Sequence, residues 1–339
     1  MTDQDALVRF DNVEKFFPVP KGFIAGLRSR GDGEAVRAVD DVSFEIKRGE
    51  VLGLAGESGS GKSTVGRLAL RLLDPTAGTV YFDGVDLAIL KSEEMRKTRS
   101  RMQVVFQDPL ASLNPRMTIG QAVAHPAQIH MPELSTKQRR EEVYEMFSAV
   151  GLDPPAYYYD KYPHQISGGQ RQRVVMARGL ITRPDLIVAD EPIAMADVSV
   201  QALLLDLMMK LKDEFNLTYL FITHDLATTK YLCDRIAIMY LGKIVEEGPT
   251  DEIFATPAHP YTQALMAAVP VVDKAARRER IILEGTVPSP IDPPSGCRFH
   301  TRCFAKIGAI CEEEEPQFTS VGEGHRAACH LFLAHDRVY

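Results

Sequence analysis

The sequence predicts an α/β protein built on a parallel sheet, with flanking antiparallel strands and an inserted helical subdomain. Short apolar runs at residues 51–55, 186–189 and 217–223 have the length and composition of buried parallel strands. Helical spacing of apolar residues separates these runs, and strand, helix, strand repeats imply crossover connections within one sheet. From residue 112 to about residue 181 the pattern is helical, which predicts the inserted subdomain.

The flanking elements follow in chain order. Apolar alternation predicts antiparallel strands near residues 8–16 and 42–46. The Asp83-Gly84 pair predicts a hairpin turn. Residues 21–34, rich in Gly, Lys and Arg, indicate an exposed loop or insertion.

Two helices have a clear apolar face. In the first, Val143, Met146, Phe147 and Val150 recur at i, i+3, i+4 and i+7, and the pattern stops at Gly151. The second is longer and is predicted to place these residues on one side: Val200, Leu203, Leu204, Leu207, Met208 and Leu211.

The composition and the pattern of predicted elements change in the last third of the chain. A closing hairpin is predicted over 236–246, and after Pro257 prolines punctuate a tail with one clear helix at 261–269. We therefore predict a domain over residues 1–255 and a small extension over 256–339.

Composition excludes several classes of protein. The 339 residues are 45% apolar and 25% charged, which are ordinary globular values. The net charge of −7 argues against a nucleic-acid partner. The first ten residues lack the pattern of a secretory signal, and no apolar run approaches the length of a membrane span. The chain is expected to be soluble and cytoplasmic by itself.

One stretch fits the phosphate-binding loop pattern G-x-x-x-x-G-K-[ST] at every fixed position. It consists of Gly56, Glu57, Ser58, Gly59, Ser60, Gly61, Lys62, Ser63 and Thr64. A strand precedes it and a helix follows, so backbone N–H groups and the helix N-terminus are expected to surround phosphate oxygens. Lys62 is expected on the β and γ phosphates of ATP, Ser63 on Mg²⁺ and Thr64 on the α-phosphate. A Gly-rich turn is the alternative.

Hydrolysis of ATP also needs bound Mg²⁺ and an oriented water. Asp190 closes the apolar strand at 186–189, which places its carboxylate to reach Mg²⁺. Glu191 follows as the candidate general base. Two solvated acids are the alternative interpretation of this pair.

A second candidate anion site lies at Ser167, Gly168, Gly169 and Gln170, which precede a helix. Ser167 is an N-cap candidate, and the glycine pair exposes backbone N–H groups. One chain thus has two phosphate sites and one nucleotide pattern. A head-to-tail dimer accommodates both, with each ATP held between the loop of one subunit and the capped helix of the other.

These motifs, in this order, resemble the ATP-binding cassette proteins of ABC transporters, whose signature is Leu-Ser-Gly-Gly-Gln. Here Ile166 stands in place of the leucine. The resemblance covers the first 255 or so residues. It implies that Gln107 senses Mg²⁺ and the membrane partner, that His224 contacts the γ-phosphate, and that Phe17 stacks on adenine, with Phe16 as the competing aromatic.

One segment departs from this family. After the acidic pair the family usually shows Ser-Ala-Leu-Asp, whereas this chain has Ala194-Met195-Ala196-Asp197. Asp197 is kept and the serine hydroxyl is absent. In the family this segment crosses the dimer interface toward the nucleotide of the partner, so the departure bears on the opposite site or on its coupling.

Four cysteines gather in the extension: Cys297, Cys303, Cys311 and Cys329. Four thiolates suit either a tetrahedral Zn²⁺ or an iron–sulfur cluster. The gaps of five, seven and seventeen residues are longer than the pairs of structural zinc sites, which favours a cluster, while His300, His325 and His330 keep Zn²⁺ open. Unligated buried cysteines are the remaining alternative.

The extension has a resemblance of its own. His259-Pro260-Tyr261, with Gly296-Cys297-Arg298-Phe299 and Arg302-Cys303, resembles the C-terminal extension of dipeptide and oligopeptide importer ATPases. Members of that group carry a [4Fe-4S] cluster on four such cysteines. Residues 21–34 resemble an insertion found in one of the two ATPase subunits, which implies a heterodimer with a sister ATPase.

The resemblance implies further partners and a location. These are two transmembrane permease subunits, an extracytoplasmic solute-binding protein as an indirect partner, and a peripheral position on the cytoplasmic side of the cell membrane. We therefore predict an ATPase subunit that energises uptake of di- or oligopeptides through nucleotide-driven dimer closure. Related cassettes serve oligosaccharide or nickel uptake. Two alternatives of another class are a soluble cassette ATPase without a transport role and an iron–sulfur sensor.

Overall fold

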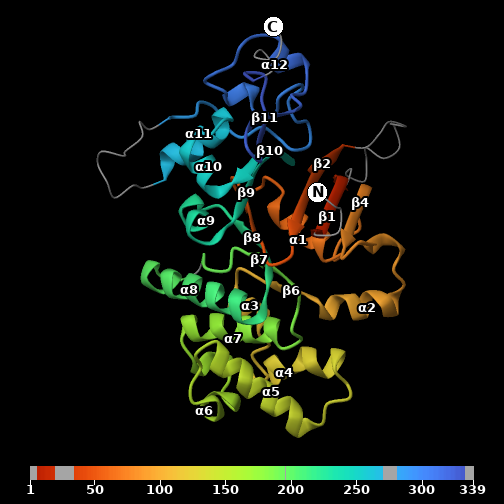
Figure 1. The fold of residues 1–339 in the computed structure, drawn as a ribbon, viewed down its shortest axis with the longest axis vertical. Helices are drawn as coiled ribbons and strands as arrows, with labels where there is room; N and C mark the ends of the chain where they lie inside the picture. Colours follow the sequence, from red (N-terminus) through yellow and green to blue (C-terminus); the bar gives the residue numbers. More distant parts are fainter. Residues whose placement is uncertain (1–5, 20–33, 195, 270–280, 333–339) are drawn as a thin grey trace, which may run out of the picture. The chain divides into compact units, whose positions relative to one another are not determined.

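The computed structural model describes residues 6–19, 34–194, 196–269 and 281–332 (Figure 1). Its residues form two compact units. The first consists of Met1–Val8, Ile46–Val51 and Tyr81–Ile222, and the second of Arg9–Glu45, Leu52–Val80 and Thr223–Tyr339. Apart from Glu34, the insertion predicted at 21–34 lies outside the described residues.

The first unit contains parallel strands that pair in the order β8-β7-β6. Their bounds are β6 (Met102–Val105), β7 (Leu186–Asp190) and β8 (Thr218–Thr223). In the parallel register Val104 pairs with Val188, and Val188 with Leu220. The predicted parallel sheet with buried strands is therefore confirmed in this unit, and the carboxyl ends of β6 and β7 lie side by side.

Helices make up most of the rest of the first unit. They are α2 (Ser92–Ser100), α3 (Pro109–Ser112), α4 (Ile119–His130), α5 (Thr136–Ala149), α6 (Pro155–Tyr159), α7 (Gly168–Leu180) and α8 (Val198–Phe215), with 3-10 turns η2 (Leu87–Ile89) and η3 (Pro163–Gln165). Helices α4, α5 and α7 pack against one another (Figure 1). The apolar face predicted for 143–150 is buried, as Val143, Met146 and Phe147 are each 0% exposed.

One face prediction is wrong. Leu203 on α8 is 58% exposed, whereas Leu204 and Leu211 are 1% exposed. Because a helix advances about 100° per residue, the contiguous pair Leu203–Leu204 spans more of the surface than the buried stripe covers.

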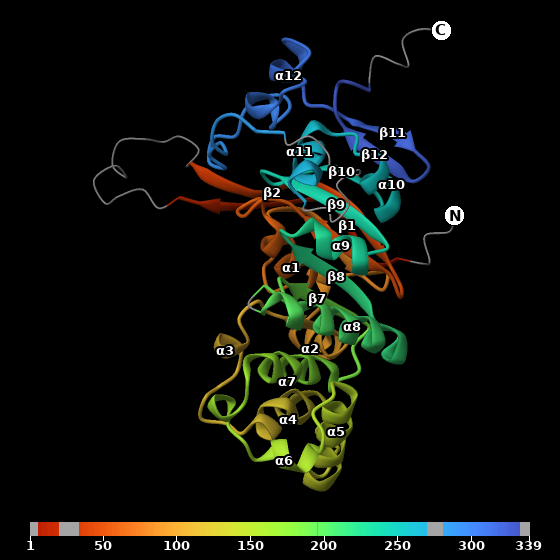
Figure 2. The same ribbon diagram turned by 90° about the vertical axis from the view of Figure 1, so that its left-hand side faces the viewer.

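The second unit carries a sheet in the order β11-β12-β10-β9-β3. The strands are β3 (Val51–Ala55), β9 (Arg235–Tyr240), β10 (Lys243–Pro249), β11 (Phe318–Gly322) and β12 (His325–Ala328). Strands β3 and β9 are parallel, and β9 and β10 form the predicted closing hairpin. Strands β11 and β12, which the sequence did not predict, continue the sheet beyond β10 (Figure 2).

The remaining elements of this unit surround the sheet. They are α1 (Lys62–Ala69), α9 (Leu226–Leu232), α10 (Thr250–Ala255), α11 (Pro260–Ala268), η5 (His300–Arg302) and α12 (Ile310–Glu313). Strands β1 (Ala6–Pro18), β2 (Ala35–Lys47) and β4 (Ala77–Phe82), most of whose residues belong here, pair in the order β2-β1-β4. The predicted hairpin at Asp83-Gly84 is present, since β4 pairs antiparallel with β5 (Val85–Asp86).

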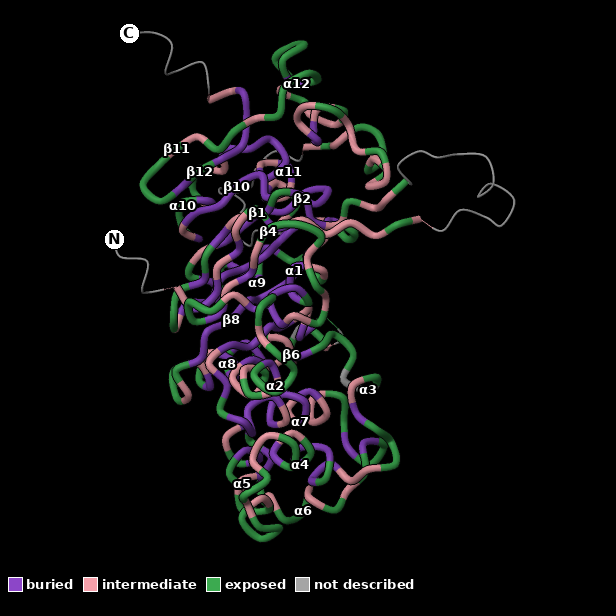
Figure 3. Tube along the Cα trace, turned by 90° about the vertical axis from the view of Figure 1, so that its right-hand side faces the viewer, coloured by how far each residue is buried: buried purple, intermediate pink, exposed green. Residues whose placement is uncertain are grey.

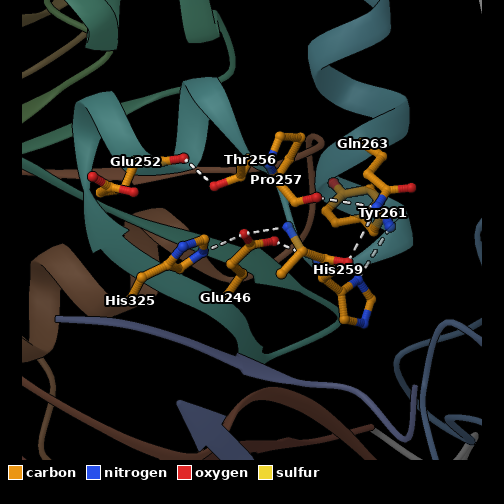
Figure 4. A network of polar contacts seen from close by, with 9 residues as sticks. Glu246, Glu252, Thr256, Pro257, His259, Tyr261, Gln263 and His325 are labelled. Carbon is orange, nitrogen blue, oxygen red and sulfur yellow. Dashed lines mark hydrogen bonds and ion pairs between the residues drawn. The ribbon is translucent and has the colours of Figure 1, made fainter. Parts of the chain in front are cut away.

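A buried polar network joins β10 to the extension (Figure 4). The carboxylate of Glu246, 0% exposed, accepts hydrogen bonds from the N–H groups of Ala258 and His259, each at 2.8 Å. The Nε2 atom of His325 on β12 lies 2.7 Å from Glu246 Oε1. Strand β10 is buried in Figure 3, whereas α12 is largely exposed. Glu246 therefore links β10, the start of α11 and β12.

An aromatic cluster also belongs to this unit. The rings of Tyr240, Tyr261 and Phe299 are almost fully buried, and their centroids lie 4.7 to 5.4 Å apart. No helix among the described residues is both long and apolar enough to cross a bilayer.

Candidate nucleotide-binding site

The phosphate-binding loop connects β3 to α1 in the second unit. Three of its glycines have positive φ, with values of 152° at Gly56, 80° at Gly59 and 109° at Gly61. A Cβ atom on Gly56 would lie 2.2 Å from the carbonyl oxygen of Met239, and one on Gly61 would lie 2.0 Å from that of Ala38. The loop backbone therefore packs directly against β9 and β2, which only glycine permits at these two positions.

Lys62 lies inside this loop and is 5% exposed. Its Nζ atom donates to the carbonyl oxygens of Gly56 at 2.7 Å and Glu57 at 2.8 Å, and lies 3.4 Å from Ser60 Oγ. A buried ammonium at the start of α1 adds its charge to the positive end of the helix, and the two together favour an anionic ligand.

Glu57 is held at three of its groups. Its N–H donates to the hydroxyl of Tyr261 at 2.9 Å, and its carbonyl accepts from Lys62. Its carboxylate accepts two hydrogen bonds from the guanidinium of Arg302, at 2.9 and 3.3 Å. Sequence reasoning did not assign a role to Tyr261 or Arg302 at this loop, and only their presence in the motifs of the extension marked them.

His224 and the aromatic candidates also belong to the second unit. His224 follows β8 and is exposed, while Phe16 and Phe17 near the end of β1 are half-buried. Lys15 Nζ lies 5.3 Å from the ring centroid of Phe17, and the guanidinium of Arg37 lies 5.5 Å from that of Phe16. Because neighbouring strand residues face opposite sides, only one of the two rings faces a given base.

The candidate acids belong to the first unit. Asp190 ends β7, and Glu191 follows with a left-handed backbone, φ 49°. The N–H of Glu191 donates to the carbonyl of Ile222 at 2.9 Å, which fixes the strand end. Gln107 Nε2 donates to Glu191 Oε2 at 3.0 Å. The paired strands β6 and β7 thus bring Gln107 and Glu191 together.

The signature residues begin α7 in the same unit. Ser167 Oγ accepts from the N–H of Gln170 at 3.2 Å, and Gln170 Oε1 accepts from the N–H of Ser167 at 2.9 Å, which forms a capping box. A Cβ atom on Gly168 would meet nothing within 4 Å. A cavity of about 540 Å³ lies here, lined in part by Ser167, Gly168, Gly169 and Asp197. The exposed glycine backbone thus borders open space of ligand size.

The four cysteines of the extension influence one another electrostatically. Burial, together with the charges of Cys329, Cys303 and Cys311, raises the pKa of Cys297 to about 12. The N–H groups of Phe299, Ala305 and Leu331 hydrogen bond to the sulfurs of Cys297, Cys303 and Cys329, in each case two residues earlier in the chain. In the ranges that the structure describes, no group of three or more His, Cys, Asp or Glu side chains is placed to hold a metal ion.

Comparison with known proteins identifies two family regions. Residues 39–194 match the ABC transporter family, and residues 245–311 match the C-terminal region of the oligopeptide/dipeptide transporter family. The chain is 47% identical over 334 residues to the oligopeptide transport ATP-binding protein AppF of Bacillus subtilis, covering 97% of this chain and 98% of that protein. It is 46% identical to the dipeptide transport ATP-binding protein DppF of Haemophilus influenzae, covering 94% of each.

A solved structure supports the same assignment. A dimeric ATP-binding cassette in a post-hydrolysis state bound to ADP and Pi matches 72% of this chain and 98% of its own, with a TM-score of 0.62 and 29% identity. The ABC ATPase fold predicted from the motifs is therefore confirmed. The chain belongs to the ABC transporter family of ATPases, in the group of ATP-binding proteins that carry the oligopeptide/dipeptide transporter C-terminal region.

Proposed function

We propose that this chain is the ATP-hydrolysing subunit that energises uptake of di- or oligopeptides by an ABC importer. The observation that carries the proposal is the buried Lys62 inside a glycine loop, in a chain that resembles oligopeptide and dipeptide transport ATP-binding proteins over 97% and 94% of its residues. ATP binding closes a dimer of ATPase subunits, and hydrolysis reopens it.

We assign binding of the ATP triphosphate to the phosphate-binding loop. Lys62 neutralises charge on the β and γ phosphates, Ser63 contributes a hydroxyl to Mg²⁺, and Thr64 contacts the α-phosphate. The remaining loop residues contribute backbone N–H groups: Gly56, Glu57, Ser58, Gly59, Ser60 and Gly61. The exposed His224 contacts the γ-phosphate, and Phe17 stacks on adenine. The carbonyl contacts of Lys62 support this assignment, because phosphate oxygens can take the place of these carbonyl oxygens as hydrogen-bond acceptors.

We assign the hydrolysis of ATP to Asp190 and Glu191. Asp190 holds Mg²⁺, and Glu191 accepts a proton from the attacking water as the water oxygen bonds to the γ-phosphorus. The bond to the β–γ bridging oxygen breaks, and ADP and phosphate leave. The hydrogen bond from Gln107 orients the carboxylate of Glu191 and connects it to the segment that we assign to the membrane partner.

The signature is assigned to the nucleotide of the partner subunit. Ser167, Gly168, Gly169 and Gln170 offer a helix start with open space at Gly168, and Asp197 borders the same cavity. The capping box rigidifies the helix start before a nucleotide arrives. We further propose that residues 1–255 form the ATPase domain, with a helical subdomain at about 112–181, and that residues 256–339 form the extension.

The partners follow from the same assignment. We propose a heterodimer with a sister ATPase, two transmembrane permease subunits and an indirect role for an extracytoplasmic solute-binding protein. The chain would then lie peripherally on the cytoplasmic side of the cell membrane. Co-purification tests this: expression with the neighbouring permease and ATPase genes is expected to yield one complex containing this chain. Recovery of this chain alone under those conditions would contradict the assembly.

Turnover by that complex tests the cargo. We expect ATP hydrolysis to rise when the solute receptor is loaded with a di- or oligopeptide. Stimulation by an oligosaccharide or by nickel, with none by peptides, would assign the chain to a related importer instead.

We propose that Cys297, Cys303, Cys311 and Cys329 hold a [4Fe-4S] cluster, with Zn²⁺ as the alternative. The gathering of four cysteines in one short extension supports the proposal. Three N–H···S hydrogen bonds also suit sulfur atoms that carry negative charge. A bound cluster would cross-link the loops of the extension. Protein purified without oxygen is expected to be brown and to contain iron and sulfide. Colourless protein with stoichiometric zinc would contradict the cluster and support a Zn²⁺ site.

A further inference from the structure

We propose that the C-terminal extension positions the phosphate-binding loop, and that Arg302 and Tyr261 are the positioning residues through which it sets the affinity for ATP. This inference rests on the proposed function of the loop. It concerns residues that lie outside the nucleotide motifs and that act on the nucleotide only through Glu57.

The contacts converge on one residue of the loop. Arg302 makes a two-pronged ion pair with the carboxylate of Glu57, and its side chain is 9% exposed. Tyr261, 0% exposed, accepts the N–H of Glu57. Since the carbonyl of Glu57 is bound by Lys62, the extension fixes two of the three polar groups of this residue. The peptide plane that precedes Glu57 and the side chain of Glu57 are therefore oriented from outside the loop.

Arg302 is itself firmly held. It ends the single turn η5, where its N–H donates to the carbonyl of Phe299 at 2.9 Å. Phe299 is 0% exposed and packs against Tyr240 and Tyr261. The guanidinium also lies 3.4 Å from the Tyr240 hydroxyl. The packed aromatic cluster therefore holds Arg302 and Tyr261, the two residues of the extension that contact the loop, in fixed positions.

Charge gives the contact a second effect. Glu57 places a carboxylate in a loop that is to receive a triphosphate, and like charges at short range repel. Arg302 neutralises this carboxylate and draws it toward the extension. Losing Arg302 leaves the loop less ordered and more negative, and both changes weaken the binding of an anion.

Both effects act on bound ATP before and during hydrolysis alike. Uniform binding of this kind alters KM and leaves kcat unchanged. A residue that merely stabilises the fold would change the melting temperature and neither kinetic constant at temperatures where the protein is folded. This split separates a positioning role from a structural one.

The test compares Arg302→Met with Arg326→Met in the full-length chain. Arg326 offers a matched control, because it also joins the extension to a buried glutamate, Glu247 at 2.7 Å, which lies on β10 outside the loop. Binding of a non-hydrolysable ATP analogue with Mg²⁺ is measured by calorimetry. The KM and kcat of ATP hydrolysis are measured on the assembled transporter. We expect Arg302→Met to weaken analogue binding and raise KM about tenfold, the order of one charge-assisted contact, with kcat within about twofold.

Milder variants guard against misfolding. Tyr261→Phe removes only a hydroxyl and is expected to raise the Kd about threefold to fivefold. Arg302→Lys keeps the charge and is expected to recover part of the loss. Glu57→Gln in the Arg302→Met background removes the exposed charge and is expected to recover part of it as well. Unchanged binding in both Arg302→Met and Tyr261→Phe, or an equal loss in Arg326→Met, would overturn the inference.

Lys62→Ala separates the inference from the proposed function. If this variant binds the analogue as tightly as the wild type, the loop is not the nucleotide site and the proposed function fails. If Lys62→Ala loses binding while Arg302→Met keeps it, the proposed function stands and the inference alone fails. Coupling is reciprocal, so the analogue is also expected to slow amide hydrogen exchange at Arg302 and Cys303 in the wild type. Unchanged exchange at these amides would contradict the coupling.

Discussion

Replacing Glu246 by glutamine is expected to loosen the junction between β10 and the extension. The carboxylate is fully buried, and its two oxygens accept from the N–H groups of Ala258 and His259 and from His325 Nε2. Glutamine has nearly the same shape, but one of its two terminal atoms is a donor. Whichever way the amide is oriented, at least one buried donor then faces another donor.

The cost follows from the least damaging orientation. If the amide oxygen keeps Ala258 and His325, the amide nitrogen meets the N–H of His259, now at a site built for an acceptor at 2.8 Å. One hydrogen bond to a charged group is lost and a buried N–H is left unpaired, which together cost about 3 kcal/mol. The opposite orientation loses two bonds and costs more.

Native-state hydrogen exchange measures this cost locally. Strand β12 pairs with β10 through Glu246 opposite Ala327 and Glu247 opposite Arg326. Amides of this pair are expected to exchange roughly 100-fold faster in Glu246→Gln, which corresponds to the predicted loss. Glu252→Gln makes the same chemical change at an exposed residue of α10 and is expected to leave these amides unaffected. Acceleration below about fivefold in Glu246→Gln, or equal acceleration in both variants, would refute the reasoning.

Three further predictions concern the loop, the catalytic carboxylate and a buried histidine. Gly56→Ala is expected to abolish nucleotide binding, because its Cβ would lie 2.2 Å from the Met239 carbonyl. Gly59→Ala, whose Cβ would meet nothing within 4 Å but whose φ of 80° strains alanine, should weaken binding less in the same calorimetric titration. Glu191→Gln is expected to bind ATP and to hydrolyse it at least about 100-fold more slowly in the assembled transporter; normal turnover would remove its role as base. Burial lowers the pKa of His259 to about 4, although the charge of Glu246 opposes this shift. The unfolded chain takes up a proton at this histidine between pH 7 and pH 5.5 and the folded chain does not, so stability should fall by about 1 kcal/mol over that interval. His259→Asn, which keeps an acceptor for the N–H of Tyr261, should lose this part of the pH dependence in denaturant titrations, and an unchanged pH profile would contradict the burial argument.

Local patterns predicted those parts of the fold that local physics determines. The apolar stripe of Val143, Met146 and Phe147 is buried because the helical period alone defines that face. The runs that became β7 and β8 are buried, because strands of a parallel sheet that is covered on both faces are mostly apolar along their length. Leu203 was misplaced because period reasoning does not define how wide the buried stripe is.

Strands β11 and β12 could not be found in this way. Burial in β11 alternates between exposed and half-buried residues, and β12 carries a buried His325 whose partner is Glu246 on another strand. Their pairing depends on an edge supplied by β10, which is distant in the sequence. The sequence of residues 318–328 therefore does not by itself predict two strands.

The residues of the candidate site likewise fall into those that local patterns predict and those that only the structure shows. The phosphate loop and the signature were visible because short spacings carry their function. The contact between Glu57 and Arg302 joins residues 245 positions apart, and no local pattern encodes it. Family resemblance assigned Gln107 only to Mg²⁺ and the membrane partner, whereas the structure gives its hydrogen bond to Glu191.

The most direct test of the account is peptide uptake into proteoliposomes that contain this chain, its sister ATPase and both permeases, with ATP inside and the solute receptor outside. Labelled peptide is expected to accumulate only with hydrolysable ATP, and Lys62→Ala in this chain is expected to abolish accumulation. Uptake that continues undiminished in Lys62→Ala, or that proceeds without ATP, would contradict the claim that this chain powers transport.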